Sequence, residues 1–212
     1  TRNWSDGLLD ALRAAHDGAT PQGLFKRYEY AFDAAYREHV EPAEALQDIA
    51  VIEGMGGGAQ TERVFTRPGD ADHVINIKLY RRGEPLKLSK VIPPLEHLGL
   101  NVAQEATYDV TPGDGVAPCS VHDFRTEESL GRAVDMGAVR KNVEEVLAAI
   151  FSGRTEDDGF NALVISAGLN WREAWLLRAA AKYLLQAGIP FSLGYIEQTL
   201  SKNPAIARAL IA

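Results

Sequence analysis

The chain has 212 residues, 46% hydrophobic and 24% charged, which is enough for one domain with an appendage or two small domains. A formal net charge of -7 with scattered basic residues argues against a nucleic acid or an anionic membrane as partner, since both need clustered lysine and arginine. The single cysteine, Cys119, excludes a disulfide framework and a multi-thiolate zinc site, and it fits a reducing compartment such as the cytoplasm.

The ends of the chain and its apolar runs bear on targeting. No uninterrupted apolar run approaches the roughly 20 residues of a membrane-spanning helix, so no membrane segment is predicted. The chain opens TRNWSDG, with neither an initiator methionine nor a signal-peptide pattern. We therefore expect it to be an excised fragment.

The first 55 residues predict helices. Asn3 or Ser5 can cap the first helix, and Thr20 followed by Pro21 predicts the start of a second. That second helix is expected to run through TPQGLFKRYEYAFDAAYREH with one apolar face, formed by Phe25, Tyr28, Phe32, Ala35 and Tyr36. A third helix is predicted from Pro42, and the glycine-rich GMGGGAQ at 54–60 is predicted to be a linker.

The middle of the chain alternates with a period of two and predicts strands. In HVINIKLYRRG, the apolar Ile75, Ile77 and Leu79 share one face, and Asn76, Lys78 and Tyr80 share the other. A helix is predicted over roughly Ser89 to Leu98, ended by Gly99, with Pro93 and Pro94 near its start or kinking it. The order strand, strand, helix, strand, strand, helix predicts a four-stranded antiparallel sheet with both helices on one face. This α+β sandwich is a permuted relative of the ferredoxin-like split βαβ arrangement.

From about Asp157 the sequence predicts helices to the end. Asn170 and Glu173 form a capping box, and Leu169 is placed as a hydrophobic staple. In the helix that follows, an apolar arc is expected to be formed by Leu176, Leu177, Ala180, Ala181, Tyr183 and Leu184, opposite a charged side of Arg172, Arg178, Lys182 and Gln186. Trp171 and Trp175 project among those charges. The predicted organisation is a helical segment at 1–55, an α+β module at 56–155 and a helical bridge at 156–212.

Two blocks carry a resemblance to a known family: INIKLYRRGEPLKLSKVIPPLEHLGLNV, and DDGFNALVISAGLNWREAWLLRAAAKYLLQAGIPFSLGYIEQTL. Here the chain resembles the large-type bacterial NAD-dependent glutamate dehydrogenases, although it departs from the family pattern in GMGGGAQ and in Pro93-Pro94. The resemblance implies a region just before the catalytic domain, with an ACT-like module and a helical bridge. The family's catalytic lysines and dinucleotide fingerprint find no match here.

The resemblance implies a non-catalytic regulatory and scaffolding fragment. Its parent would oxidatively deaminate L-glutamate to 2-oxoglutarate and ammonia with NAD, whereas the fragment would be inactive and hold no cofactor. Its expected partner is the remainder of the parent enzyme, which would be homo-oligomeric at full length. The alternative is a free-standing ACT-like sensor that binds an amino acid.

Motifs that suggest chemistry are weak, and no catalytic, cofactor-binding or metal-binding residue is predicted. GMGGGA lacks the strand before and the helix after that a dinucleotide loop needs. Cys119 and His122 lie on opposite faces of a strand, so the group Cys119, His122 and Asp123 is interpreted as structural. The other histidines show no metal-ligand spacing.

Two candidate sites remain. The basic stretch LYRRGEPLKLSK is either a solvated turn, which we favour, or an effector loop formed by Arg81, Arg82, Gly83 and Ser89, because in ACT modules the matching loop docks small amino acids. Trp171, Trp175 and Arg178 have the composition of an interface between domains. Alternatively the rings cover FNALVISAG or stack on Arg178. We expect at least one ring to stay more than about a third exposed.

Overall fold

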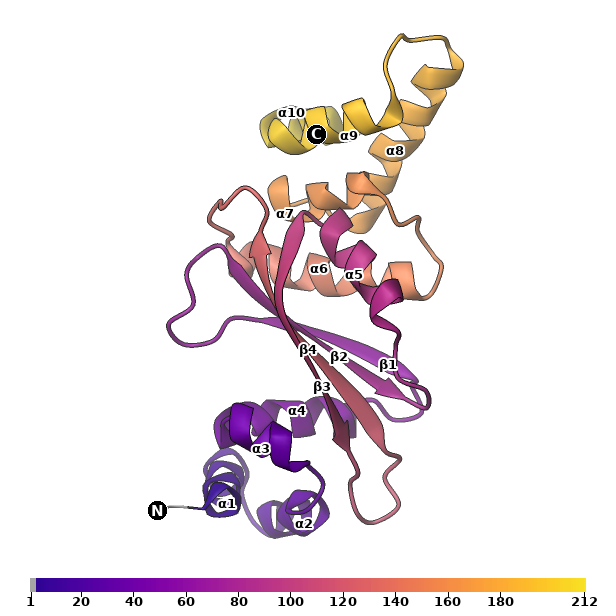
Figure 1. Ribbon diagram of the computed structural model, residues 1–212. Helices are drawn as coiled ribbons and strands as arrows, with labels where there is room; N and C mark the ends of the chain where they lie inside the picture. Colours follow the sequence, from indigo (N-terminus) through magenta and orange to yellow (C-terminus); the bar gives the residue numbers. More distant parts are fainter. Residues whose placement is uncertain (1–2) are drawn as a thin grey trace. The chain divides into compact units, whose positions relative to one another are not determined.

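The computed structural model describes residues 3–212 (Figure 1). Within that range the N-terminal helices are α1 (Trp4–Ala15), α2 (Thr20–Tyr28), α3 (Ala34–His39) and α4 (Pro42–Gly54). The central part contains β1 (Gln60–Phe65), β2 (Val74–Arg82), α5 (Leu88–His97), β3 (Leu100–Val110), β4 (Cys119–Glu128) and α6 (Met136–Phe151). The C-terminal part contains the 3-10 turn η1 (Gly159–Ala162), α7 (Leu163–Ser166), α8 (Trp171–Gln186), α9 (Leu193–Lys202) and α10 (Pro204–Ile211).

The four strands form one antiparallel sheet in the order β1-β2-β4-β3. Hairpins join β1 to β2 and β3 to β4, and α5 connects β2 to β3 with β4 between them. This is the strand order of a ferredoxin-like sandwich whose last strand has moved to the front of the chain. The predicted permuted α+β fold, flanked by helices at both ends, is therefore confirmed.

The chain forms two compact units, and all four strands contribute to both. The first contains the chain up to Thr61, with Lys78–Pro85 and Ala106–Asp123; the second contains Glu62–Ile77, Leu86–Glu105 and Phe124–Ala212. The division into segments at 1–55, 56–155 and 156–212 concerns sequence modules and stays a prediction.

In the first unit, the N-terminal helices pack on the ends of the strands. Leu8, Ile49 and Ile52 from the helices share one core with Tyr80 and Val121 from the sheet. Every one of these five side chains is almost completely buried. The helices at the start of the chain are therefore part of the sheet's hydrophobic core rather than a separate arm.

The prediction of one long second helix was wrong. The chain leaves the helix after Tyr28, and Asp33 starts a new one by accepting a 2.7 Å hydrogen bond from the backbone N–H of Tyr36. Between the two helices, Phe32 forms an antiparallel bridge with Val110 of β3. The long-range bridge and the cap outweigh the helical spacing of the aromatic residues. Tyr28, Phe32 and Tyr36 are nevertheless buried, and Phe25 is partly buried against the same core.

A buried network of charges connects α4 to β2. The Nζ of Lys78 lies 2.6 Å from Glu44 Oε1 and 2.6 Å from Asp48 Oδ2. The hydroxyls of Tyr36 and Tyr80 donate to Asp48 at 2.5 and 2.6 Å. Burial, followed by the charge of Asp48, raises the pKa of Tyr36 well above its ordinary value, so the phenol keeps the proton that it donates.

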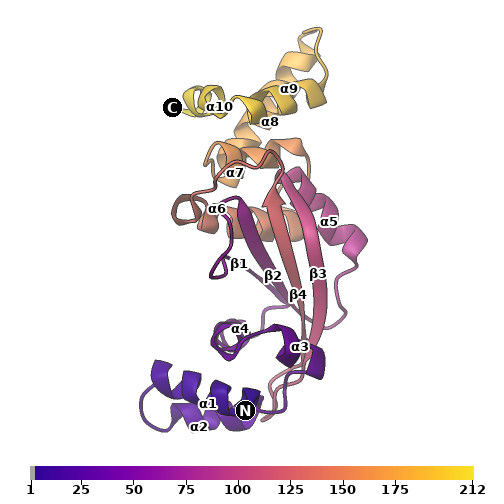
Figure 2. The ribbon, with the colours of Figure 1, turned by 60° about the vertical axis from the view of Figure 1, so that its left-hand side comes forward.

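The second unit contains the C-terminal helices (Figures 1 and 2). They pack around Phe160, Leu163, Leu177 and Leu200. The predicted capping box is present, because Asn170 accepts from the N–H of Glu173 while Glu173 accepts from the N–H of Asn170. Across residues 3–212, no helix combines the length and the apolar character needed to cross a membrane.

The structure of α5 agrees with the helix predicted from the sequence at its C-terminal end. Pro93 and Pro94 lie inside α5 rather than at its start. The helix ends at His97, and Gly99 adopts the left-handed conformation, with φ of 81°, that the sequence predicts beyond a helix end.

Candidate functional site

Arg178 lies at the centre of the contact between α8 and the segment before η1. Its guanidinium makes two parallel bonds with Asp158, at 2.7 Å from Nε to Oδ2 and 2.8 Å from Nη2 to Oδ1. Nη2 also donates to Asn161 Oδ1 at 2.9 Å, and Nη1 donates to Thr155 Oγ1 at 3.2 Å. Because a carboxylate, an amide and a hydroxyl all accept from the planar guanidinium, Arg178 has a structural role: it attaches α8 to the segment before η1.

The placement of Arg178 on an exposed charged side of α8 was wrong. The side chain is only 1% exposed, and its guanidinium lies 5.8 Å from the ring centre of Phe160 rather than against a tryptophan. The partners that bury Arg178 come from 17 to 23 residues earlier in the chain, so helical periodicity could not reveal them. Arg178 therefore belongs to the interior and not to a surface that includes Trp175.

The two tryptophans lie at the surface of α8. Trp175 is 50% exposed, which confirms that one ring stays more than a third exposed. Trp171 is half-buried, with the guanidinium of Arg172 at 4.4 Å and that of Arg154 at 5.8 Å from its ring centre. Together with Leu176, these four residues line an open hollow of about 500 Å³. Its lining combines three large, mainly apolar side chains with two guanidinium groups.

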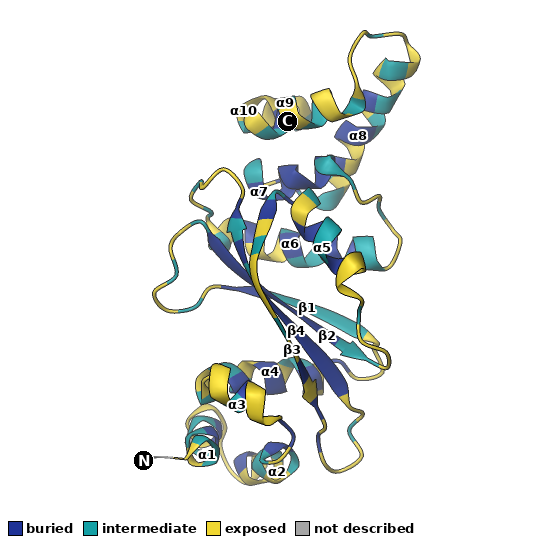
Figure 3. Cartoon of the chain, viewed as in Figure 1, coloured by how far each residue is buried: buried dark blue, intermediate teal, exposed yellow. Residues whose placement is uncertain are grey.

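The apolar face of α8 continues beyond the tryptophans. Leu176 is 55% and Tyr183 is 71% exposed, and Leu184 is exposed as well. Figure 3 shows both buried and exposed stretches along α8. Only part of the predicted apolar arc is core, because the buried residues of α8 are Ala174, Leu177, Arg178 and Ala181. The apolar arc of α8 is wider than the roughly 100° that one packed helix face needs. The width of this arc in the sequence therefore indicated that α8 has a second apolar face, which is exposed.

We call the exposed residues Trp175, Leu176, Tyr183 and Leu184 the α8 face. They follow the spacing i, i+1, i+8 and i+9, which places them on one side of the helix. Single exposed apolar residues are ordinary, whereas a stripe of large ones along a helix marks a surface that another element covers.

The candidate effector loop is already engaged by the protein itself. Arg82 donates to the carbonyls of Gly56 and Ile52, and Arg81 donates to Gln60 Oε1 at 3.2 Å. Gly83 has φ of 82°, which explains the glycine by the turn alone. Arg81, Arg82 and Gly83 belong to the first compact unit, whereas Ser89 belongs to the second and is exposed in α5.

The group Cys119, His122 and Asp123 is buried in β4. Burial raises the pKa of the Cys119 thiol to about 11, which disfavours the nucleophilic thiolate at neutral pH. His122 Nδ1 lies 2.9 Å from Thr107 Oγ1, while Asp123 lies 3.9 Å from Lys78 Nζ. His122 and Asp123 thus contact different partners, which agrees with the structural interpretation of this group.

The GMGGGAQ loop joins helix α4 to strand β1, the reverse of the strand, loop and helix order that presents backbone amides to a pyrophosphate. Among residues 3–212, no group of three or more His, Cys, Asp or Glu side chains has the arrangement of a metal site.

A permuted ferredoxin-like sandwich placed between two sets of helices defines the class: an ACT-type module with helical extensions. Residues 60–139 match the family described as "Glutamate dehydrogenase, ACT3 domain". Residues 11–55 match "Glutamate dehydrogenase, helical motif 2" and residues 155–212 match "Glutamate dehydrogenase, helical motif 3". The chain belongs to this glutamate dehydrogenase family.

Three relatives, each named "NAD-specific glutamate dehydrogenase", match over almost the whole chain. The protein from Mycobacterium tuberculosis is 37% identical over 99% of the chain, and that from Halomonas elongata is 35% identical over 100%. The protein from Pseudomonas aeruginosa is 33% identical over 99%. In each case the match covers 13% of the relative's length, so the chain corresponds to a small part of these proteins.

The exposure of Trp175 predicts a small effect on folding. Trp175→Ala is expected to lower the unfolding free energy of the 212-residue chain by about 1 kcal/mol, well below the ~3–5 kcal/mol typical of a buried large aromatic. Chemical denaturation measures the loss, with Leu177→Ala as the matched control on the buried side of α8, where ~2–5 kcal/mol is expected. A loss for Trp175→Ala in the buried range would show that the ring is core.

Proposed function

We propose that this chain is a non-catalytic regulatory and scaffolding segment of a larger cytoplasmic NAD-dependent glutamate dehydrogenase. The parent would oxidise L-glutamate to 2-oxoglutarate and ammonia, with NAD bound outside this segment, and would assemble as a homo-oligomer. Support comes from the names of the relatives and from the 13% of their length that the match covers. The buried and already engaged polar residues described above agree with a structural role.

The observation that carries this proposal is the α8 face with the hollow beside it. Leu176 and Tyr183 expose more than half of their surface, and Trp175 exposes half. Since the relatives are far longer than this chain, we assign the occupant of this face to another segment of the same polypeptide. The guanidinium groups of Arg154 and Arg172 in the lining of the hollow favour an apolar helix with carboxylates beside it.

The test uses the full-length protein that contains this chain. Substituting both Trp175→Ser and Leu176→Ser is expected to weaken assembly or glutamate-dependent NAD reduction by at least about tenfold, the equivalent of ~1.4 kcal/mol. Sedimentation and steady-state kinetics report the two effects. Tyr30→Ser is the matched control, because Tyr30 is 81% exposed and belongs to the other compact unit. Equal behaviour of the two variants would refute docking at the α8 face.

The proposal also predicts that the 212-residue chain neither binds NAD nor turns over glutamate. The physical reason is that the glycine-rich loop follows a helix and precedes a strand, so no helix N-terminus faces it. Titration calorimetry with NAD at micromolar to millimolar concentration should give no saturable heat. Saturable binding at micromolar affinity would contradict the non-catalytic assignment.

A further inference from the structure

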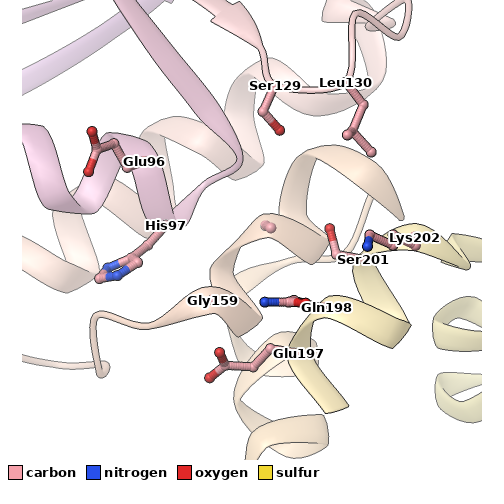
Figure 4. Close-up of a pocket in the computed structure, with 10 residues that line it drawn as sticks. Glu96, His97, Ser129, Leu130, Gly159, Glu197, Gln198, Ser201 and Lys202 are labelled. Carbon is pink, nitrogen blue, oxygen red and sulfur yellow. The ribbon is translucent and has the colours of Figure 1, made fainter. Parts of the chain in front are cut away.

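A polar cavity of about 300 Å³ opens within the second compact unit (Figure 4). Its walls come from four segments that are distant in sequence: the end of α5, the loop after β4, the η1 turn and one side of α9. Its lining includes the polar side chains of His97, Ser129, Glu197, Gln198, Ser201 and Lys202. The cavity shares no residue with the effector loop at Arg81–Gly83 or with the α8 face.

The polar groups of this cavity are largely unused by the protein. Within residues 3–212, the side chains of Ser129, Gln198, Ser201 and Lys202 make no hydrogen bond or ion pair with another residue. The backbone around them is ordered by its own contacts, since Ser129 N–H donates to Gly99 and Ser201 C=O accepts from Arg132 at 3.2 Å. Two hydroxyls, an amide and an ammonium group are therefore available to bind a ligand, and hydrogen bonds hold the backbone that carries the two serines.

Glu197 marks the acidic end of the cavity. Burial, followed by the negative charge of Asp158, raises its pKa above the ordinary value, whereas His97 and Arg178 act in the opposite direction. His97 is itself held by Asp157, at 2.9 Å from Nδ1 to Oδ1, and Arg178 is held by Asp158. The carboxylate of Glu197 thus lies in a site where an added cation would be stabilised.

The backbone beside Glu197 fits this carboxylate closely. A Cβ added to Gly159 would lie 2.7 Å from Glu197 Oε2, closer than real Cβ atoms approach other heavy atoms. Gly159 has no left-handed φ that would otherwise require glycine. The absence of a side chain there is explained by the space that Glu197 occupies at the cavity wall.

Lys202 supplies the opposite charge. It follows Glu197 by five residues on α9, and it makes no ion pair with Glu197 or with any other described residue. In Figure 4, Glu197 lies on the side of His97 and Gly159, while Lys202 lies on the side of Ser201, with Gln198 between them. Acid and base are therefore separated across the cavity with neutral polar groups between them.

We propose that this cavity binds a small zwitterion of the amino-acid class, with the ligand's ammonium at Glu197 and its carboxylate at Lys202 and the neighbouring serine hydroxyls. A zwitterion satisfies both separated charges at once, whereas an amine or a carboxylate alone satisfies only one. The volume is at the small end of ligand pockets, which suits a molecule of amino-acid size. This site does not depend on the docking proposed for the α8 face.

The experiment is titration calorimetry of the 212-residue chain with L-serine and L-glutamine as probes. Ethanolamine and 3-hydroxypropionate are the matched controls, because they are serine without its carboxylate and serine without its ammonium group. We expect at least one amino acid to bind at millimolar affinity or tighter, and the two controls to bind at least about tenfold more weakly. Failure of both amino acids at millimolar concentration, or equal binding of a control, would overturn the proposal.

Three variants locate the site. Glu197→Gln keeps the shape and removes the charge, and it is expected to weaken binding by at least about tenfold. Gly159→Ala should weaken binding to a similar degree, because its methyl group must displace the Glu197 carboxylate. Arg81→Gln in the effector loop should bind as the unchanged chain does. Circular dichroism confirms that each variant is folded. Loss of binding in Arg81→Gln but not in Glu197→Gln would refute binding in the cavity and assign the ligand to the effector loop.

Discussion

Replacing Arg178 by alanine is expected to lower the unfolding free energy of the chain by about 3–5 kcal/mol, the range seen when one partner of a buried ion pair is removed. Five contacts are lost together, including both bonds to Asp158 and the bond to Asn161. Asn161 is buried and Asp158 is half-buried, so their oxygens would lose a partner where water replaces it poorly. The segment before η1 would lose its main attachment to α8.

Chemical denaturation measures this effect, and Lys182→Ala is the matched control. Lys182 lies one turn further along α8 and pairs with Glu156 at 2.6 Å, but both side chains are about half exposed. An exposed pair of this kind contributes only about 0.2–1 kcal/mol. Arg178→Lys should fall between the two, because lysine keeps the charge but cannot form the two parallel bonds. Equal losses for Arg178→Ala and Lys182→Ala would show that the buried hydrogen bonds of Arg178 contribute little to stability.

Local chemistry explains which elements could be predicted from the sequence. The capping box at Asn170 and Glu173, the helix start at Pro42 and the glycine after α5 depend on residues within a few positions of one another. The alternation around Ile75 and Ile77 likewise depends only on the pleat of one strand. Because these signals appeared in a fixed order along the chain, the permuted sandwich could be predicted before its contacts were known.

Contacts between distant residues explain what the sequence could not show. The break before Asp33 depends on a bridge to Val110, and the burial of Arg178 depends on Asp158. Lys78 was assigned to the side of β2 opposite its apolar residues, and α4 buries that side by supplying Glu44 and Asp48. The polar cavity at Glu197 also escaped prediction, because its walls come from four segments and no single stretch has a ligand-binding pattern.

The network around Lys78 gives the second large expected effect. Lys78 is fully buried between two carboxylates at 2.6 Å, with Asp123 Oδ2 at 3.9 Å. Lys78→Ala removes the cation from Glu44, Asp48 and Asp123, of which Asp48 is completely buried. We expect a loss of about 3–5 kcal/mol in unfolding free energy, with the contact between α4 and β2 weakened first.

Three further variants separate charge from packing. Lys78→Met keeps most of the volume, so a loss close to that of Lys78→Ala would assign the effect to the charge, whereas a much smaller loss would assign it to the cavity left by alanine. Asp48→Asn keeps only one acceptor oxygen for the hydroxyls of Tyr36 and Tyr80, which now donate to different oxygens of Asp48. It leaves Glu44 to pair with Lys78, so a smaller loss than that of Lys78→Ala is expected.

Lys90→Ala is the control for the loss of a lysine as such, because Lys90 is exposed on α5 and should change stability by less than about 0.5 kcal/mol. Urea denaturation followed by circular dichroism gives all four values on one scale. If Lys78→Ala behaved like Lys90→Ala, the buried charges would not stabilise the contact between α4 and β2. The attachment of the N-terminal helices would then depend on the apolar core around Ile49 and Ile52 alone.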